Sequence, residues 1–77
     1  MRTKEQNMAL AFAPFGKELK IVKITADEKT RRHLENLGLL VGADVISMYD
    51  ISGDVIIKVR DCKLALNRSL AMKIQVA

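Results

Sequence analysis

The chain has 77 residues, enough for one domain with a thin hydrophobic core. Hydrophobic residues make up 49% of it and aromatic residues 4%, so we expect a folded chain with an aliphatic core. The single cysteine excludes an internal disulfide and a zinc site of the CxxC type, and the net charge of +4 is too dispersed to select a polyanion as partner.

The segment before Lys17 is interpreted as a lead-in and not as a targeting segment. Its apolar stretch, Met8 to Phe15, has too few residues before the small-residue run Ala11-Phe12-Ala13 for a signal peptide, which needs roughly 7–15. No apolar run approaches the roughly 20 residues of a transmembrane helix. We expect residues 1–7 to be flexible and the rest of the lead-in to fold against the domain.

Lys17 to Thr25 predicts a first strand, because it is rich in Ile and Val and follows the turn residues Pro14 and Gly16. Its apolar residues fall on both faces of the strand. Such a pattern fits a strand with the domain interior on one side and the lead-in on the other.

A short amphipathic helix is predicted from about Asp27 to Leu37. Thr25 and Glu28 have the spacing of a capping box, in which the Thr25 side chain would cap the helix. The negative charge of Asp27 would also favour the positive end of the helix dipole.

The sequence also predicts where this helix ends. Leu34 and Leu37 lie three residues apart on one face, so we expect both to be buried against the strands. Gly38 reaches a left-handed conformation without strain and ends the helix. Leu39 beyond it is expected to pack back on Leu34 in a Schellman-type closure.

More short strands are predicted after the helix, with a helical turn capped by Asn67 before the last one. Five short strands with one helix between the first and second indicate a mainly β fold, a small closed barrel. Closure would remove exposed sheet edges. The predicted later strands are Asp44–Asp50, Asp54–Arg60, Lys63–Leu66 and Lys73–Val76.

The residues give little support to catalysis or metal binding. His33 has Lys29 and Leu37 one helical turn away, so no second metal ligand is placed beside it. Cys62 falls in a predicted hairpin turn, where an incidental residue is the simpler interpretation. The chain has no GxSxG motif and no phosphate-binding glycine loop. We expect no enzyme activity, no cofactor and no metal site.

Two runs of residues carry a specific order of motifs. Thr30 to Gly42 contains a basic pair, two leucines three apart, a glycine, an apolar pair and a second glycine. Leu64 to Arg68 is followed by Ala71, Ile74 and Val76. Over roughly residues 8–77 the chain resembles the ferrous iron transport protein A (FeoA) family, whose helix-to-strand signature and closing segment these runs match.

The resemblance implies an SH3-like barrel of five strands, with one α-helix between strands 1 and 2 and a short helical turn before the last strand. It would form a single domain over residues 1–77. Val41 stands where the family usually has proline, and Asp61 stands where glycine is common. Neither departure threatens the fold, because Asp61 tolerates a left-handed turn.

The resemblance also implies a function. The chain would be an accessory and regulatory protein of bacterial ferrous iron uptake, acting on the membrane ferrous iron permease (protein B) and its cytosolic GTPase domain. It would lie in the cytoplasm, peripheral to the inner membrane through this partner and without inserting into the bilayer.

Two other functions compete with this one. An SH3-like nucleic-acid-binding module would suit the net charge and the turn from Gly42 into a strand, but the charges are dispersed and stacking aromatics are too few. A metal carrier would have to use His33 or Cys62, and two such ligands are too few for a tight site.

A partner surface can also be predicted. Barrel closure points alternate residues of Asp54–Arg60 inward, so Ile56 should face outward beside charged neighbours, a combination that often marks an interaction site. Leu39 and Leu40 would extend this patch if they lie on the same side. The basic pair Arg31 and Arg32 is the alternative contact surface. The partner would be the permease or a second copy of the chain.

Overall fold

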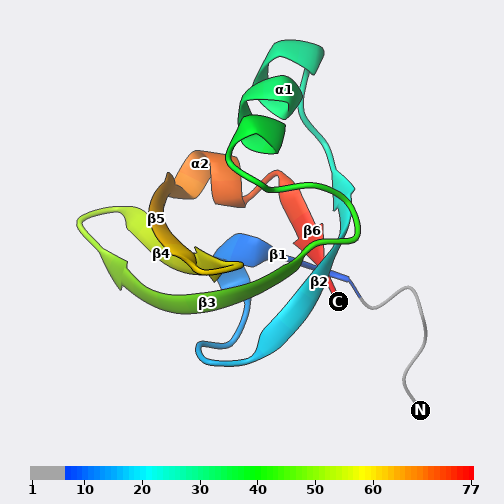
Figure 1. The fold of residues 1–77 in the computed structure, drawn as a ribbon. Coiled ribbons are helices and arrows are strands. Elements are labelled where there is room, and N and C mark those ends of the chain that lie inside the picture. Colours follow the sequence, from blue (N-terminus) through cyan, green and yellow to red (C-terminus); the bar gives the residue numbers. More distant parts are fainter. Residues whose placement is uncertain (1–6) are drawn as a thin grey trace.

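The computed structural model describes residues 7–77 as one antiparallel sheet with two helices and a 3-10 turn (Figure 1). The sheet order is β1-β6-β2-β3-β4-β5. Flexibility was expected for residues 1–7, and of these all but residue 7 lie outside the described residues. The elements are β1 (Met8–Ala9), η1 (Leu10–Phe12), β2 (Glu18–Ile24), α1 (Glu28–Asn36), β3 (Asp44–Ile51), β4 (Asp54–Val59), β5 (Cys62–Asn67), α2 (Arg68–Ala71) and β6 (Ile74–Val76).

The mainly β fold class, the helix after the first long strand and the helical turn before the last strand are confirmed. The sheet has six strands and not five, because the lead-in adds β1. Met8 pairs with Val76 and Ala9 with Gln75, so the lead-in joins the sheet beside β6. η1 then turns Leu10 into the core.

The sheet curls without complete closure, since no pairing joins the edge strands β1 and β5 within residues 7–77. Side chains connect the elements near this opening. The guanidinium of Arg68, on α2, lies 5.6 Å from the centre of the Phe12 ring on η1. Arg68 Nη1 also lies 3.4 Å from Asp50 Oδ2 on β3. These contacts connect α2, η1 and β3 without a continuous strand ladder.

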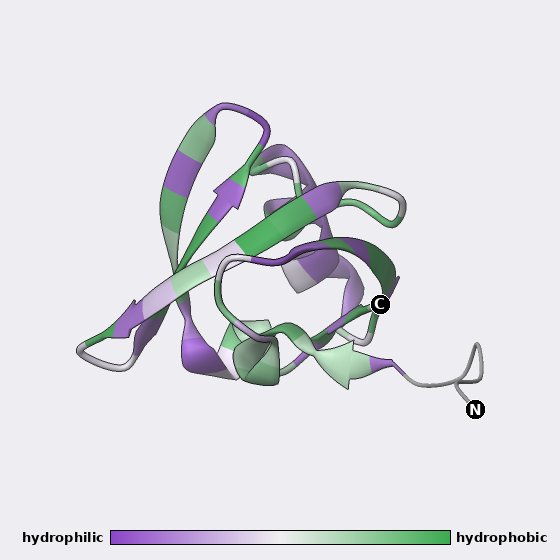
Figure 2. Ribbon diagram, turned by 90° about the horizontal axis from the view of Figure 1, so that it is seen from below, coloured by the Kyte–Doolittle hydropathy of each residue, from purple (hydrophilic) through white to green (hydrophobic). Residues whose placement is uncertain are grey.

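The interior is aliphatic, as the composition predicts. Every strand carries hydrophobic residues, coloured green in Figure 2, and on β4 the inward residues Val55, Ile57 and Val59 are buried. All three aromatic side chains are exposed, and they are Phe12, Phe15 and Tyr49. The largest fully buried side chains include Leu10, Ile21, Leu34, Leu39, Ile57, Leu66 and Ile74.

Two tight turns join β3, β4 and β5. Ser52 and Gly53 both have positive φ, 51° and 84°, which is the pattern of a type I′ hairpin turn. In the next turn Arg60 has a φ of 57°, whereas Asp61 does not enter the positive-φ region. The left-handed residue of this turn is therefore Arg60 and not the expected Asp61.

The start of α1 differs from the predicted capping box. Asp27 is the N-cap, and its Oδ1 accepts a hydrogen bond of 2.9 Å from the Thr30 N–H. The Thr25 hydroxyl instead donates to the Lys73 carbonyl at 3.2 Å. Thr25 therefore connects the end of β2 to the turn before β6, and it cannot cap the helix.

The apolar anchor of α1 is smaller than predicted. Leu34 is fully buried, but Leu37 is 37% exposed, so its predicted burial is wrong. Leu37 is the C-cap residue at the end of the helix. Leu39, two residues later, is fully buried and occupies the core in its place.

This difference gives a test of the core. Leu34→Ala should lower the free energy of unfolding by about 2–5 kcal/mol, because it leaves a cavity beneath the helix. The matched change Leu37→Ala should cost less than about 1 kcal/mol, as expected of a partly exposed side chain. Urea denaturation followed by circular dichroism measures both. Equal losses for the two variants would show that both leucines contribute to the core.

Candidate partner-binding groove

The five residues predicted to bind a partner do not form one surface. Leu39 is fully buried, so it cannot contact a partner. Arg32 lies on another face of α1 and pairs with Glu28, Nη2 to Oε2, at 3.0 Å. Ile56 is half-buried on β4, opposite Tyr49. Only Arg31 and Leu40 line the same depression of the surface.

That depression lies between α1, β2 and the loop after the helix, and we call it the α1–β2 groove. Its volume is about 590 Å³. Three partly exposed aliphatic residues give it apolar walls: Val22 is 37% exposed, Leu40 38% and Val41 63%. It is lined by Val22, Lys23, Ile24, Arg31, Glu35, Leu40 and Val41.

Val22 reaches the groove because β2 contains a bulge. The pairing of β2 with β6 shifts register between Ile21 and Lys23, so Val22 and Lys23 are both exposed. The sequence shows apolar residues on both faces of this strand, and packing against the lead-in was the expected reason. That explanation is wrong for Val22, which is turned toward the groove by the bulge.

The loop that carries Leu40 and Val41 is fixed at its start by the end of α1. The Gly38 N–H donates to the Glu35 carbonyl at 2.9 Å, and the Leu39 N–H donates to the Leu34 carbonyl at 2.9 Å. This is the hydrogen-bond pattern of a Schellman motif, so the predicted closure is confirmed. Leu40 is therefore the first loop residue free to point outward.

The far end of the loop is bonded to β2. The Gly42 N–H donates to the Ile21 carbonyl at 2.7 Å, and the Ile21 N–H donates to the Ala43 carbonyl at 2.9 Å. Gly42 has a φ of 98°, which favours glycine at this turn. On the outer side, Lys20 Nζ lies 2.9 Å from Asp44 Oδ1 and 3.3 Å from the Gly42 carbonyl. Both ends of the loop are thus held before any partner binds.

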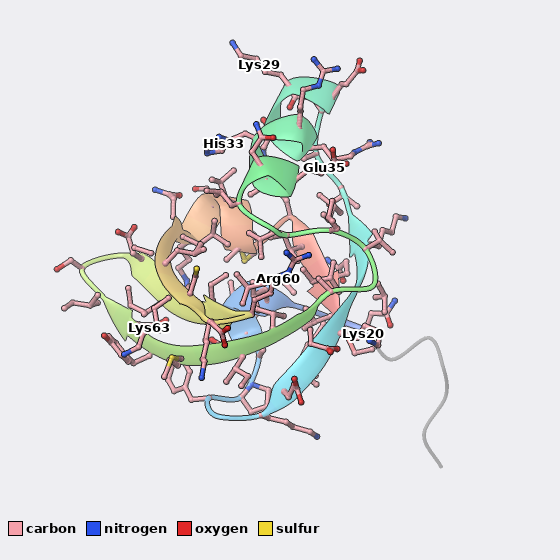
Figure 3. All side chains as sticks on the ribbon, in the orientation of Figure 1. Lys20, Lys29, His33, Glu35, Arg60 and Lys63 are labelled. Atoms are coloured by element: carbon pink, nitrogen blue, oxygen red, sulfur yellow. The ribbon has the colours of Figure 1, made fainter. Side chains whose placement is uncertain are left out.

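The rim of the groove carries charges of both signs. Arg31 and Glu35 lie on α1, and Lys23 lies on β2. Arg31 Nη2 donates to the Ala26 carbonyl at 3.4 Å. None of these three side chains joins an ion pair in the described part of the chain. Figure 3 shows Glu35, Lys29 and His33 on the exposed surface of α1. The rim charges are therefore available to a partner.

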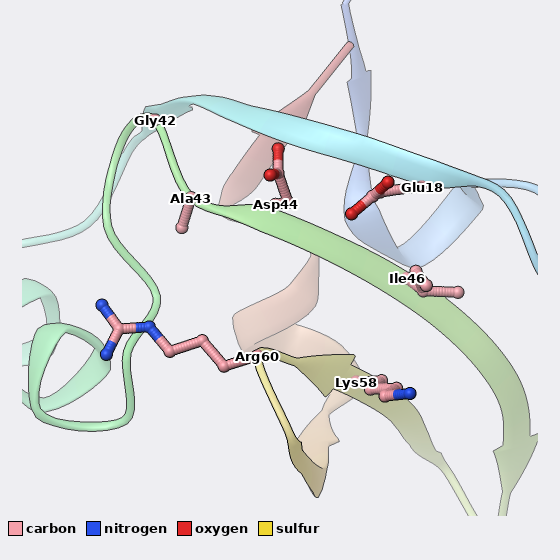
Figure 4. Close-up of a pocket in the computed structure, with 7 residues that line it drawn as sticks. All are labelled: Glu18, Gly42, Ala43, Asp44, Ile46, Lys58 and Arg60. Carbon is pink, nitrogen blue, oxygen red and sulfur yellow. The ribbon is translucent and has the colours of Figure 1, made fainter.

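A second cleft, of about 410 Å³, lies on the other side of the loop (Figure 4). Glu18 and Asp44 lie along its β2 and β3 side, and Lys58 and Arg60 come from the end of β4 and its turn. The opposite charges of the two sides compensate each other, and Asp44 is already paired with Lys20. This cleft does not select a ligand of one charge.

The described residues give little support for catalysis or metal binding. No group of three or more His, Cys, Asp or Glu side chains able to hold a metal ion occurs in residues 7–77. Cys62 is exposed at the start of β5. His33 lies on α1 and lines a shallow depression with Glu28, Lys29, Arg32 and Asn36, and Glu28 is paired with Arg32. Among the described helices, none is long and apolar enough to span a membrane.

Comparisons with known proteins agree with this architecture. A family model described as the FeoA domain matches residues 8–77. An Fe(2+) transport protein A from Methanocaldococcus jannaschii is 36% identical over 67 residues, covering 87% of this chain and 82% of that protein. The crystal structure of an iron uptake regulatory protein, FeoA, matches with a TM-score of 0.84 at 25% identity, over 94% of this chain and 96% of that one.

A further match supports the shape of the fold. FeoA of Stenotrophomonas maltophilia, solved in complex with zinc and described as a prokaryotic SH3 domain protein, gives a TM-score of 0.78 at 21% identity. The match covers 91% of this chain and 89% of that one. The SH3-like fold and the resemblance of the sequence motifs are both confirmed.

The stability of the fold, and so of the groove wall formed by α1, should depend on pH through the N-cap residue Asp27. Hydrogen bonds from the Thr30 side chain and then from the Thr30 N–H lower the pKa of Asp27 from its usual value of 3.8. A carboxylate with a lowered pKa stabilises the fold above its unfolded value, and this contribution is lost as the pH falls through the folded value. Wild type should therefore exceed Asp27→Ala in stability at pH 7, and the difference should shrink well below pH 3.8.

Asp27→Asn is the matched control, because an amide oxygen caps a helix without titrating. The stability difference between the Asn and Ala variants should not change with pH. Urea midpoints measured across the pH range test this. If wild type stays more stable than Asp27→Ala by the same amount down to the lowest pH, ionisation of Asp27 does not contribute to the stability of the fold.

Proposed function

We infer the function of this chain from its family: it belongs to the FeoA family of ferrous iron transport. We propose that it is an accessory protein that regulates the membrane ferrous iron permease, protein B, by binding its cytosolic part through the α1–β2 groove. Iron would be the cargo of the permease. The chain itself would work in the cytoplasm, at the inner membrane through this contact, as a protein without catalytic activity.

The observation that carries the proposal is the composition of the groove. Val22, Leu40 and Val41 present apolar surface, and Arg31 and Lys23 present cations without ion-pair partners in residues 7–77. Interfaces between proteins combine an apolar centre with a polar rim in this way. A small metal or nucleotide would need convergent polar ligands, which the groove does not provide.

The rigidity of the groove supports the same conclusion. The loop with Leu40 and Val41 is hydrogen-bonded to α1 at one end and to β2 at the other. A surface held in its binding conformation loses little conformational entropy when a partner arrives. The complementary segment of the permease should carry an apolar side chain for Leu40 and Val41. It should also carry a carboxylate for Arg31 or Lys23.

The test is binding of the full chain to detergent-solubilised permease, with and without GTP. Leu40→Asp places a charge on the apolar wall, and Arg31→Glu reverses a rim charge. Leu40→Asp should weaken binding by about tenfold or more, as expected for a residue at the centre of an interface, and Arg31→Glu should weaken it by about three- to tenfold, as expected for a rim charge. Both side chains are at least partly exposed, so the fold should persist.

Arg32→Glu is the matched control, because Arg32 lies on the same helix but outside the groove. It should bind as wild type does. If Leu40→Asp remains folded and binds with unchanged affinity, the groove is not the contact surface. If Arg31→Glu and Arg32→Glu weaken binding equally, a general charge effect explains it better than the groove.

A further inference from the structure

Strand β5 leaves one edge of the sheet unpaired. Within the described residues β5 pairs only with β4, and Val59 and Cys62 flank the two-residue turn between them. Residues that flank such a turn form a hydrogen-bonded pair, and the ladder alternates from there. Lys63 and Ala65 therefore point their N–H and C=O groups away from β4. Both residues are exposed, and outside the strand ladder no backbone hydrogen bond reaches them from residues 7–77.

An apolar row leads across the outer face of the sheet to this edge. In the register of the strands, Tyr49 lies opposite Ile56, and Ile56 lies opposite Ala65. The register shift between Ser47 and Tyr49 places Tyr49 in the row. Tyr49 and Ala65 are exposed and Ile56 is half-buried. The row ends at β5, where its apolar surface meets unpaired backbone groups.

Charges of opposite sign lie on the two sides of this row. Lys58 and Lys63 are directly opposite each other on one side, which is unfavourable for like charges. Asp54 lies opposite Asn67 on the other side. Neither lysine nor Asp54 belongs to an ion pair in the described chain. The surface therefore has two lysines on one side, one aspartate on the other and an apolar centre.

We propose that β5 pairs antiparallel with β5 of a second copy of this chain, about a two-fold axis at Ala65. Ala65 then faces Ala65 of the other copy, and the two exchange their unpaired N–H···O=C bonds. Lys63 faces Asn67 of the other copy. The apolar row continues across the axis, because Ile56 and Tyr49 of each copy extend it on both sides.

The charge distribution is what selects a second copy as the occupant. A two-fold axis at Ala65 brings the two lysines of one molecule to the side that carries Asp54 in the other. Lys63 comes within two strand spacings, about 10 Å, of Asp54 in the second copy, a distance near one Debye length. An axis at Lys63 would instead oppose two lysines. An axis at Leu64 would put Lys63 against Ala65 and break the apolar row.

The paired segment is short, so the association should be weak. Interfaces of small area give transient complexes, and we expect a dissociation constant on the order of 10–500 µM. Sedimentation equilibrium of the full chain should show the mass rising from monomer toward dimer across about 10 µM to 1 mM. A chain that remains a monomer throughout this range overturns the proposal.

Two variants at Ala65 test whether β5 is the strand that pairs in the dimer. Ala65→Pro removes an N–H that has no partner in the single chain, so the fold should tolerate it while the dimer is lost. Ala65→Val keeps this N–H and should still form dimers. A dimer that survives Ala65→Pro would show that β5 is not the interface.

Exchanging the charges of Lys63 and Asp54 tests the register in which the two β5 strands pair. Lys63→Glu and Asp54→Lys should each weaken the dimer by about two- to threefold, because these charges lie about one Debye length apart, and the double variant should recover wild-type affinity. Failure of the double variant to recover would exclude the axis at Ala65. Ile56→Asp should also weaken the dimer, and Leu40→Asp in the α1–β2 groove should leave it unchanged. These two variants separate this surface from the groove of the proposed function.

A disulfide can confirm the axis directly. Paired Ala65 residues would have Cα atoms about 5.5 Å apart, a separation that a disulfide spans. With Cys62→Ser to remove the native thiol, Ala65→Cys should form a covalent dimer on mild oxidation. Lys58→Cys in the same background lies one strand away from the edge and should not. Cross-linking of both variants to equal extent would indicate random collision and contradict the proposal.

Discussion

The burial of Leu39 is the constraint on which the candidate site depends. Leu39 lies two residues past the C-cap of the helix, yet it is fully buried and its N–H donates to the Leu34 carbonyl. This return into the core attaches the end of α1 to the sheet and reverses the direction of the chain. Leu40 and Val41 must then face outward, above β2, where they form one wall of the α1–β2 groove.

Irregularities in two strands determine what the surface presents. A regular β2 would turn Val22 and Lys23 to opposite faces, but the bulge exposes both and lets Val22 complete the apolar wall of the groove. The register shift between Ser47 and Tyr49 in β3 similarly places Tyr49 opposite Ile56 on the outer face of the sheet. Bulges bend a strand and redirect side chains, and each one here lies beside a surface proposed to bind a partner.

Most of the fold follows from the sequence, because local signals agree with it: the apolar run of β2, the Gly38 helix end and the turn residues before β4. The site follows less well. Periodicity cannot reveal a bulge, so Val22 was not predicted to line a surface. The capping-box pattern predicted Thr25 as the cap, but Asp27 caps the helix, and the Thr25 hydroxyl donates to the distant Lys73 carbonyl instead. Such contacts depend on the folded arrangement, which local patterns do not contain.

The central proposal is that this FeoA-family chain binds the permease through the α1–β2 groove. Amide signals of the isotope-labelled chain, recorded by NMR during titration with detergent-solubilised permease, test it most directly. Binding at the groove should broaden the signals of Val22, Leu40 and Val41 first, at substoichiometric permease. Broadening that begins at Ile56 and Ala65 and leaves Leu40 and Val41 unchanged would contradict the account.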